Sequence, residues 1–195
     1  MSPKSAEQLA IVRENTRANL LEAAVKVFAA NGYHASSMAL IAKTANVSKG
    51  LTYHYFESKE ALLVALVEFR LQEWLPLIEG LESIPDARER LYFLVDFVLM
   101  ELVEKTEKLR FYNSLYLNSD GVKAIELAMR KYQDQFERLF RAESKIYSVL
   151  GFEDPNTEAV FLRSLLQGIC LEYMLGPKDY PLAEMKKRIL IRYGS

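Results

Sequence analysis

Apolar residues recur along this chain with the period of an α-helix, and this spacing limits its fold more than any other feature. One stripe follows i, i+3, i+4, i+7 and i+8 and ends just before Gly32; it is formed by Leu20, Ala23, Ala24, Val27 and Phe28. The 8 glycines and 6 prolines fall mainly between such segments, and patterns typical of strands are nearly absent. We therefore predict an all-α protein of about nine helices.

The composition narrows the class of protein further. A chain of 195 residues corresponds to one or two domains and can bury a substantial core. With one cysteine, Cys170, and two histidines, we expect no disulfide framework, no metal site and no cofactor. No apolar run approaches the roughly 18 residues of a membrane span, and residues 1–8 lack the apolar core of a signal peptide. We expect a soluble, cytoplasmic protein without a membrane partner.

Charge is unevenly distributed along the chain. Residues 1–59 hold seven basic and four acidic side chains, whereas residues 60–195 hold 18 basic and 22 acidic ones. A small basic domain joined to an acidic body is the charge distribution expected of a DNA-binding protein with a second, non-DNA domain. A difference of this size also arises by chance.

The segment from Ser36 to Leu63 predicts two short helices joined by a tight turn. Ser36 or Ser37 can cap a helix that runs to about Ala45, because a serine oxygen accepts a free backbone N–H there. Asn46 lies at the turn, where it tolerates the left-handed conformation. Ser48 can then cap a second helix of residues 49–55, and a third helix opens at residue 59. This is the architecture that places a second helix in the major groove of DNA.

The predicted second helix carries donors for base edges or phosphates, namely Lys49, Tyr53 and His54, while Gly50 allows the backbone to approach DNA closely. Lys59 lies in the first turn of its helix, where the helix dipole disfavours a cation, and an outside phosphate would explain it. The alternative is an ordinary helical hairpin with a solvated polar face.

From Arg17 to Leu66 the sequence resembles the DNA-binding domain of the tetracycline repressor (TetR) family. The residues that match the family pattern are Ala23, Ala24, Phe28, Gly32, Ser37, Ile41, Ala42, Ala45, Asn46, Val47, Ser48, Gly50, Tyr53, Phe56, Lys59, Glu60 and Leu62. The resemblance implies an N-terminal three-helix helix-turn-helix domain, residues 1–58, followed by a helical ligand-binding and dimerisation domain, residues 59–195.

The resemblance also implies roles for single residues. The DNA-binding set is Ser37, Ser48, Lys49, Gly50, Leu51, Tyr53, His54 and Lys59. Within it, Ser37, Tyr53 and Lys59 would contact phosphates, and Leu51 could touch a thymine methyl.

Three positions depart from the family pattern. Asn46 replaces a glycine, and Ala39 stands where some members have a base-contacting arginine. Thr52 occupies a position that is usually aliphatic, so the sequence leaves open whether Leu51 or Thr52 points inward.

The second domain has no motif of its own, but it is rich in aromatics that form either its core or the wall of a ligand cavity. The candidate ligand-binding residues are Trp74, Phe93, Asp96, Phe97, Met100, Tyr112, Tyr116 and Phe136. Asp96 has mostly apolar helical neighbours, so it needs a basic partner from another helix or a cationic ligand.

The last two predicted helices, 157–175 and 182–193, match the pair that forms dimers in the resembling family. The candidate interface residues are Phe161, Leu165, Gly168, Ile169 and Tyr173. The alternative is that these residues pack only within one protomer.

These features favour a ligand-responsive repressor. A homodimer would bind a palindromic double-stranded DNA operator and be released by a small, largely apolar or aromatic effector. The alternative function is a helical interaction module without specific DNA binding. An enzyme is disfavoured, because the sequence holds no catalytic constellation and no phosphate-binding loop.

Overall fold

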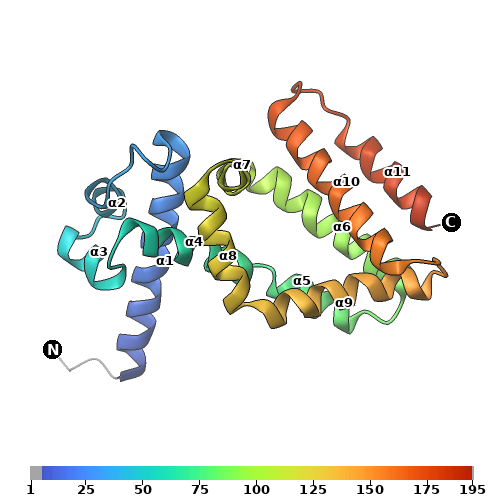
Figure 1. The fold of residues 1–195 in the computed structure, drawn as a ribbon, viewed down its shortest axis with the longest axis horizontal. Coiled ribbons are helices and arrows are strands. Elements are labelled where there is room, and N and C mark those ends of the chain that lie inside the picture. Colours follow the sequence, from blue (N-terminus) through green and yellow to red (C-terminus); the bar gives the residue numbers. More distant parts are fainter. Residues whose placement is uncertain (1–5, 195) are drawn as a thin grey trace. The chain divides into compact units, whose positions relative to one another are not determined.

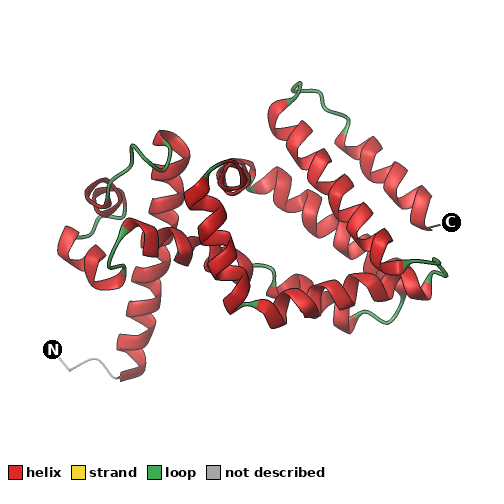
Figure 2. Cartoon of the chain, in the orientation of Figure 1, coloured by secondary structure: helices red, strands yellow, loops and turns green. Residues whose placement is uncertain are grey.

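The computed structural model describes residues 6–194, and none of these forms a strand (Figures 1 and 2). The helices are α1 (Ala6–Asn31), α2 (Met38–Thr44), α3 (Lys49–Tyr55), α4 (Lys59–Gln72), α5 (Leu75–Ser83), α6 (Ala87–Glu104), α7 (Thr106–Ser114), the 3-10 helix η1 (Leu115–Leu117), α8 (Ser119–Lys131), α9 (Gln133–Val149), α10 (Pro155–Leu175) and α11 (Leu182–Gly194). The predicted all-α class is confirmed.

Side-chain caps explain where several helices begin. Asp86 accepts the backbone N–H of Glu89 at 2.9 Å and so starts α6. Asp154 accepts the N–H of Thr157 at 3.1 Å and is followed by Pro155, which suits the first position of a helix. Each cap supplies an acceptor for an N–H that has no partner within the helix.

The described residues hold eleven α-helices, where the sequence predicted about nine. One additional break separates α4 from α5, where Pro76 falls at the start of the new helix. Another separates α8 from α9 at Tyr132, whose φ of −109° and ψ of 26° leave the helical region. No glycine or proline marks the break at Tyr132, so this boundary was not predictable from the local sequence.

Contacts divide the chain into two compact units. The first unit contains the chain up to Arg70 together with Glu107–Lys131, so α7, η1 and α8 pack with the N-terminal helices. The ring centroids of Phe28 in α1 and Phe111 in α7 lie 5.9 Å apart. The Tyr112 hydroxyl donates to the carbonyl of Leu66 in α4 at 3.2 Å. The core of this unit is therefore continuous from α1 through α4 to α7.

The second unit contains Leu71–Thr106 and Tyr132–Ser195. Its core is formed by leucines of α5 and α6 and by Tyr147 of α9, all fully buried. A Cβ added at Gly80 of α5 would meet the Phe93 ring of α6 at 2.3 Å, so these helices are closely packed because Gly80 has no side chain. Arg138 of α9 forms an ion pair with Glu82 of α5 at 2.6 Å.

Within residues 6–194, no helix combines the length and hydropathy that crossing a membrane would require. The same residues contain no group of three or more His, Cys, Asp or Glu side chains that could hold a metal ion.

Candidate nucleic-acid interface

The turn between α2 and α3 has the geometry that its sequence predicts. Asn46 has a φ of 55°, the left-handed conformation expected at this position. The N–H of Val47 donates to the carbonyl of Ala42 at 3.0 Å. Asn19 of α1 donates its side-chain amide to the carbonyl of Ala45 at 2.8 Å, which ties the turn to α1.

Of the two serines that could cap α2, Ser37 is the cap. Its hydroxyl oxygen accepts the N–H of Leu40 at 3.2 Å, and its side chain stays exposed at the start of the helix. Ser36 is buried instead and donates its hydroxyl to the carbonyl of Gly32 at 2.7 Å. Ser37 therefore keeps an accessible hydroxyl, whereas Ser36 fastens the loop between α1 and α2.

Helix α3 buries Thr52, half-buries Tyr55 and exposes its other residues. Ser48 caps it by accepting the N–H of Leu51 at 3.1 Å. Thr52 is fully buried and donates its hydroxyl to the carbonyl of Ser48 at 3.2 Å, whereas Leu51 is 37% exposed. This settles the question that the sequence left open, because Thr52 points inward and Leu51 outward. Thr52 stands where the family usually has an aliphatic residue, and its hydrogen bond to Ser48 means that the buried hydroxyl is not left unpaired.

The exposed surface of α3 carries the predicted DNA-binding residues Lys49, Gly50, Leu51, Tyr53 and His54. The Lys49 ammonium lies 5.9 Å from the centroid of the Tyr53 ring, which is 45% exposed. The buried Phe56 follows the helix, and the Arg17 guanidinium lies 5.7 Å from its ring. This surface therefore combines positive charge, hydrogen-bond donors and apolar groups.

Lys59 has partners other than those expected. Its ammonium donates to three backbone carbonyls of the α1–α2 loop, those of Tyr33 at 2.9 Å, Ser36 at 3.1 Å and His34 at 3.3 Å. These carbonyls stabilise a cation in the first turn of α4, so the outside phosphate invoked from the sequence is not needed to explain it.

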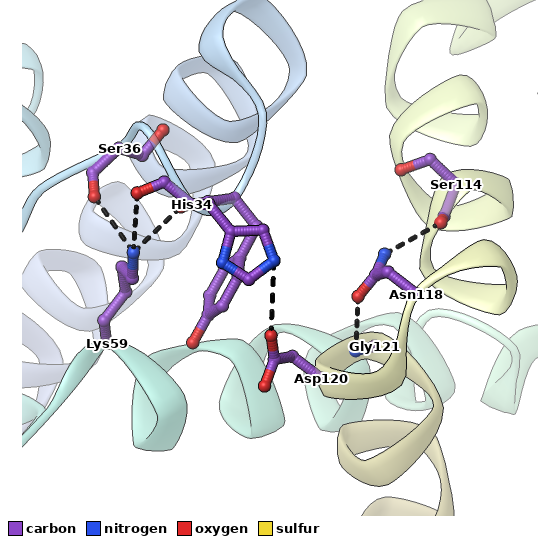
Figure 3. A network of polar contacts seen from close by, with 8 residues as sticks. His34, Ser36, Lys59, Ser114, Asn118, Asp120 and Gly121 are labelled. Carbon is purple, nitrogen blue, oxygen red and sulfur yellow. Dashed lines mark hydrogen bonds and ion pairs between the residues drawn. The ribbon is translucent and has the colours of Figure 1, made fainter.

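The same loop meets the start of α8 (Figure 3). His34 Nε2 lies 3.5 Å from a carboxylate oxygen of Asp120. Asn118 accepts the N–H of Gly121 at 2.7 Å and so caps α8. Partial burial and the nearby negative charges of Glu60 and Asp120 raise the pKa of Tyr33 to about 12, so this phenol stays neutral at physiological pH.

Residues 20–66 match the family model of bacterial regulatory proteins of the tetR family. The match covers the helices and the turn described above. This segment is a DNA-binding domain of the TetR family.

Two curated relatives extend this assignment. The HTH-type transcriptional regulator UidR of Escherichia coli is 40% identical over 73 residues, which cover 35% of this chain and 37% of the relative. The chain thus matches little more than a third of that relative's length. The HTH-type transcriptional regulator BetI of Vibrio parahaemolyticus is 29% identical over 185 residues, which cover 91% of this chain and 89% of the relative.

Solved structures of TetR-like regulators share the fold. The fatty acid degradation regulator FadR of Bacillus halodurans superposes with a TM-score of 0.69 at 26% identity, over 91% of this chain and 98% of that one. FadR of Bacillus subtilis, solved with stearoyl-CoA, gives 0.69 at 20% identity over 91% and 97%. The likeness therefore extends beyond the DNA-binding helices to the whole helical architecture.

The helices that follow the DNA-binding domain bring only some of the predicted ligand-binding residues together. Trp74 and Phe136 line one shallow hollow in the second unit, together with Leu71, Ile78, Tyr132, Gln135 and Leu139. The space that it encloses is about 10 Å³, room for about one water molecule and far below the 300–1,000 Å³ typical of small-molecule sites. Phe93 packs against Gly80 and lies 6.2 Å from the Phe97 ring. Asp96 forms an ion pair with Lys186 of α11, the partner from another helix that the sequence favoured.

The remaining three ligand candidates do not belong to this hollow. Tyr112 is buried in the core of the first unit. Tyr116 also belongs to the first unit and is 59% exposed, and Met100 in the second unit is 56% exposed. Aromatic content therefore did not distinguish core from surface or from cavity wall.

The predicted dimer residues all lie on α10, but some of them are exposed and others pack within their own unit. Phe161 and Leu165 are 46% and 37% exposed, and a Cβ added at Gly168 would meet nothing within 4 Å. Ile169 is buried within its own unit, and the Tyr173 ring centroid lies 6.2 Å from that of Tyr180, so neither is a free surface group. Helix α10 also exposes Val160, and it exposes two apolar residues that the sequence analysis did not single out, Leu171 and Leu175.

Proposed function

We propose that this protein is a transcriptional regulator that inserts α3 into the major groove of an operator. One observation carries the proposal: α3 buries the Thr52 side chain against the rest of the unit, while Lys49, Leu51 and Tyr53 stay accessible on its outer surface. A helix that is capped, held by a turn of fixed conformation and free on its outer surface is what major-groove recognition requires.

Each group on this surface has a matching partner on DNA. Lys49 would donate to guanine acceptors or to a phosphate, and the Tyr53 hydroxyl would donate to a phosphate. Leu51 would contact a thymine methyl group. Ser37, at the start of α2, would donate its hydroxyl to the phosphate backbone beside the groove.

We propose that the active form is a homodimer joined through α10 and α11. Phe161, Leu165, Gly168 and Leu175 follow a spacing of 4, 3 and 7 residues, which places them on one stripe of α10. A stripe of exposed apolar side chains with a glycine in its middle allows close packing against a second copy. Two α3 helices separated by one DNA turn would then bind a palindrome.

An effector would act on the helical body. FadR of Bacillus subtilis, which shares this fold, was solved with stearoyl-CoA. We propose a small, largely apolar or aromatic effector for the present chain, with the hollow around Trp74 and Phe136 as a place where its site could open. Effector binding would shift the population from a DNA-competent to a DNA-incompetent state and so release the operator. We propose that the protein acts in this way as a repressor in the cytoplasm.

The test compares two lysine variants on one duplex. Lys49→Met removes a charge from α3, and Lys145→Met makes the same chemical change on the exposed surface of α9. We expect Lys49→Met to bind more weakly and to make the slope of log K against log salt shallower by about 0.9 per bound protomer, the contribution of one phosphate contact. Lys145→Met should match the parent.

Equal behaviour of the two variants would contradict the proposed interface. A folded parent without salt-dependent binding to any duplex would instead favour an interaction module. The dimer is tested separately by Phe161→Glu, which should sediment as a monomer where the parent sediments as a dimer; a dimeric variant would exclude this face of α10.

A further inference from the structure

We propose that Arg17 and Arg13 of α1 form a phosphate clamp beside the recognition helix, and that this clamp lengthens the stretch of DNA backbone held by each protomer. The inference rests on the proposed function, because the clamp would serve the same DNA-bound state. It adds α1 to the contacts proposed above for α2 and α3.

The middle of α1 lies beside the end of α3. The Arg17 guanidinium is 5.7 Å from the ring centroid of Phe56, the residue that directly follows α3. Two positions later, Asn19 donates its amide to the carbonyl of Ala45 in the α2–α3 turn at 2.8 Å. Both contacts lie within the first unit. Arg17 is therefore held next to the recognition helix.

The part of α1 that precedes Arg17 is exposed along its whole length. No residue among 7–15 is buried, and the packed part of the helix begins at Leu20. This end of α1 projects past α3 (Figure 1). Arg13 lies on it, four positions before Arg17, so the two side chains are neighbours on one face of the helix.

No carboxylate neutralises either arginine. Within residues 6–194, no acidic side chain lies within ion-pair distance of Arg13 or Arg17, and no oxygen accepts a hydrogen bond from their guanidinium groups. Glu14 stands three positions before Arg17, where a helical ion pair could form, yet the guanidinium lies over the Phe56 ring instead. Like charges four positions apart destabilise a helix, and a bound anion would remove this cost.

A phosphate is the anion that fits these groups. A guanidinium carries five N–H donors in a planar fork that matches two phosphate oxygens. The half-buried Arg17 has the Phe56 ring against one side, so its position is restricted before DNA binds and less conformational entropy is lost on binding. Arg13 lies about 6 Å further along the helix axis, from where its longer reach into solvent brings it to a neighbouring phosphate.

The experiment uses three variants of the full-length protein and one control. The variants are Arg17→Gln, Arg17→Lys and the double variant Arg13→Gln/Arg17→Gln. The control is Arg88→Gln, because Arg88 is exposed on α6 of the second unit. Affinity for one duplex is measured at several salt concentrations, and each protein also selects duplexes from a random library. Circular dichroism shows that every variant is folded.

Arg17→Gln should bind at least about tenfold more weakly, with a salt slope shallower by about 0.9 per bound protomer. The double variant should lose about 1.8 per protomer, because two phosphate contacts are removed. Arg17→Lys should keep the parental slope but bind more weakly, because lysine retains the charge and cannot donate two parallel hydrogen bonds. All variants should select the parental sequence, because phosphate contacts carry no base information.

Three results would overturn the proposal. Parental affinity and slope in Arg17→Gln would remove Arg17 from the DNA interface. Weaker binding with an unchanged slope would show that Arg17 only supports the packing of Phe56. A changed selected sequence would show a contact with bases instead of phosphates.

The Lys49→Met variant separates this proposal from the proposed function. If Lys49→Met has a shallower slope while the arginine variants match the parent, the clamp fails and the role of α3 stands. If the folded parent binds no duplex, the proposed function fails and the clamp fails with it.

Discussion

Gly121 is the position where one added methyl group should disturb the first unit most. It lies in the first turn of α8, directly against the backbone of Leu115 in η1. A Cβ at this position would lie 2.3 Å from the carbonyl oxygen of Leu115, 2.6 Å from its Cα and 2.8 Å from its carbonyl carbon. Real Cβ atoms do not approach backbone so closely, and no side-chain rotation relieves the overlap. Gly121→Ala must therefore displace α8 from η1.

The expected cost follows from known effects of overpacking. Forcing a methyl group into a packed site destabilises a protein by about 1–3 kcal/mol. Alanine favours a helix over glycine by at most about 1 kcal/mol, which offsets part of this cost. Because the overlap is with backbone, we expect a cost in the upper part of this range and a net loss of about 1–2 kcal/mol, which for a chain of this size corresponds to a fall in Tm of roughly 2–8 °C.

Circular dichroism during heating measures this change, and Gly50→Ala is the matched control. A Cβ at Gly50 would meet nothing within 4 Å, so this variant should unfold at or slightly above the parental temperature. Gly50→Ala should instead weaken DNA binding, because it adds a methyl group to the outer surface of α3. A parental Tm and parental exchange rates in α8 for Gly121→Ala would refute the reasoning.

Three further predictions concern side chains of both units. Leu51→Ala should lower operator affinity severalfold but change the free energy of unfolding by less than about 0.5 kcal/mol, because Leu51 is exposed. A clearly larger loss of unfolding free energy would place Leu51 in the core beside Thr52. Ser48→Ala should cost about 1 kcal/mol in chemical denaturation because it removes the cap of α3, and an unchanged midpoint would contradict that role. Burial raises the pKa of Glu143 despite its ion pair with Arg163, so the free energy of unfolding of the parent should fall as pH rises through the titration of this carboxyl. Glu143→Gln should remove that fall. If the free energy of unfolding of Glu143→Gln depends on pH as that of the parent does, the assignment is contradicted.

Local chemistry made the interface predictable from the sequence. The caps at Ser37 and Ser48 and the left-handed Asn46 each depend on residues within three or four positions, and all three have the expected geometry. Helix α3 spans residues 49–55 as predicted, and α4 begins at Lys59. Such short-range signals do not depend on how the rest of the chain packs.

Long-range contacts were not predictable in the same way. Lys59 binds carbonyls 23–26 residues away, and nothing in the spacing of those residues marks them as partners. Tyr112 and Trp74 look alike as aromatics on helices, yet one is core in the first unit and the other lines a hollow in the second. The break at Tyr132 carries no glycine or proline. Tertiary packing decides each of these outcomes.

Selection of duplexes from a random DNA library by the purified protein tests the central claim most directly. We predict enrichment of a palindromic site whose half-sites lie about one helical turn apart, bound by two protomers with a steep dependence on salt. A folded protein that enriches no sequence, or that binds every duplex with equal affinity, would contradict the account of α3 as a recognition helix.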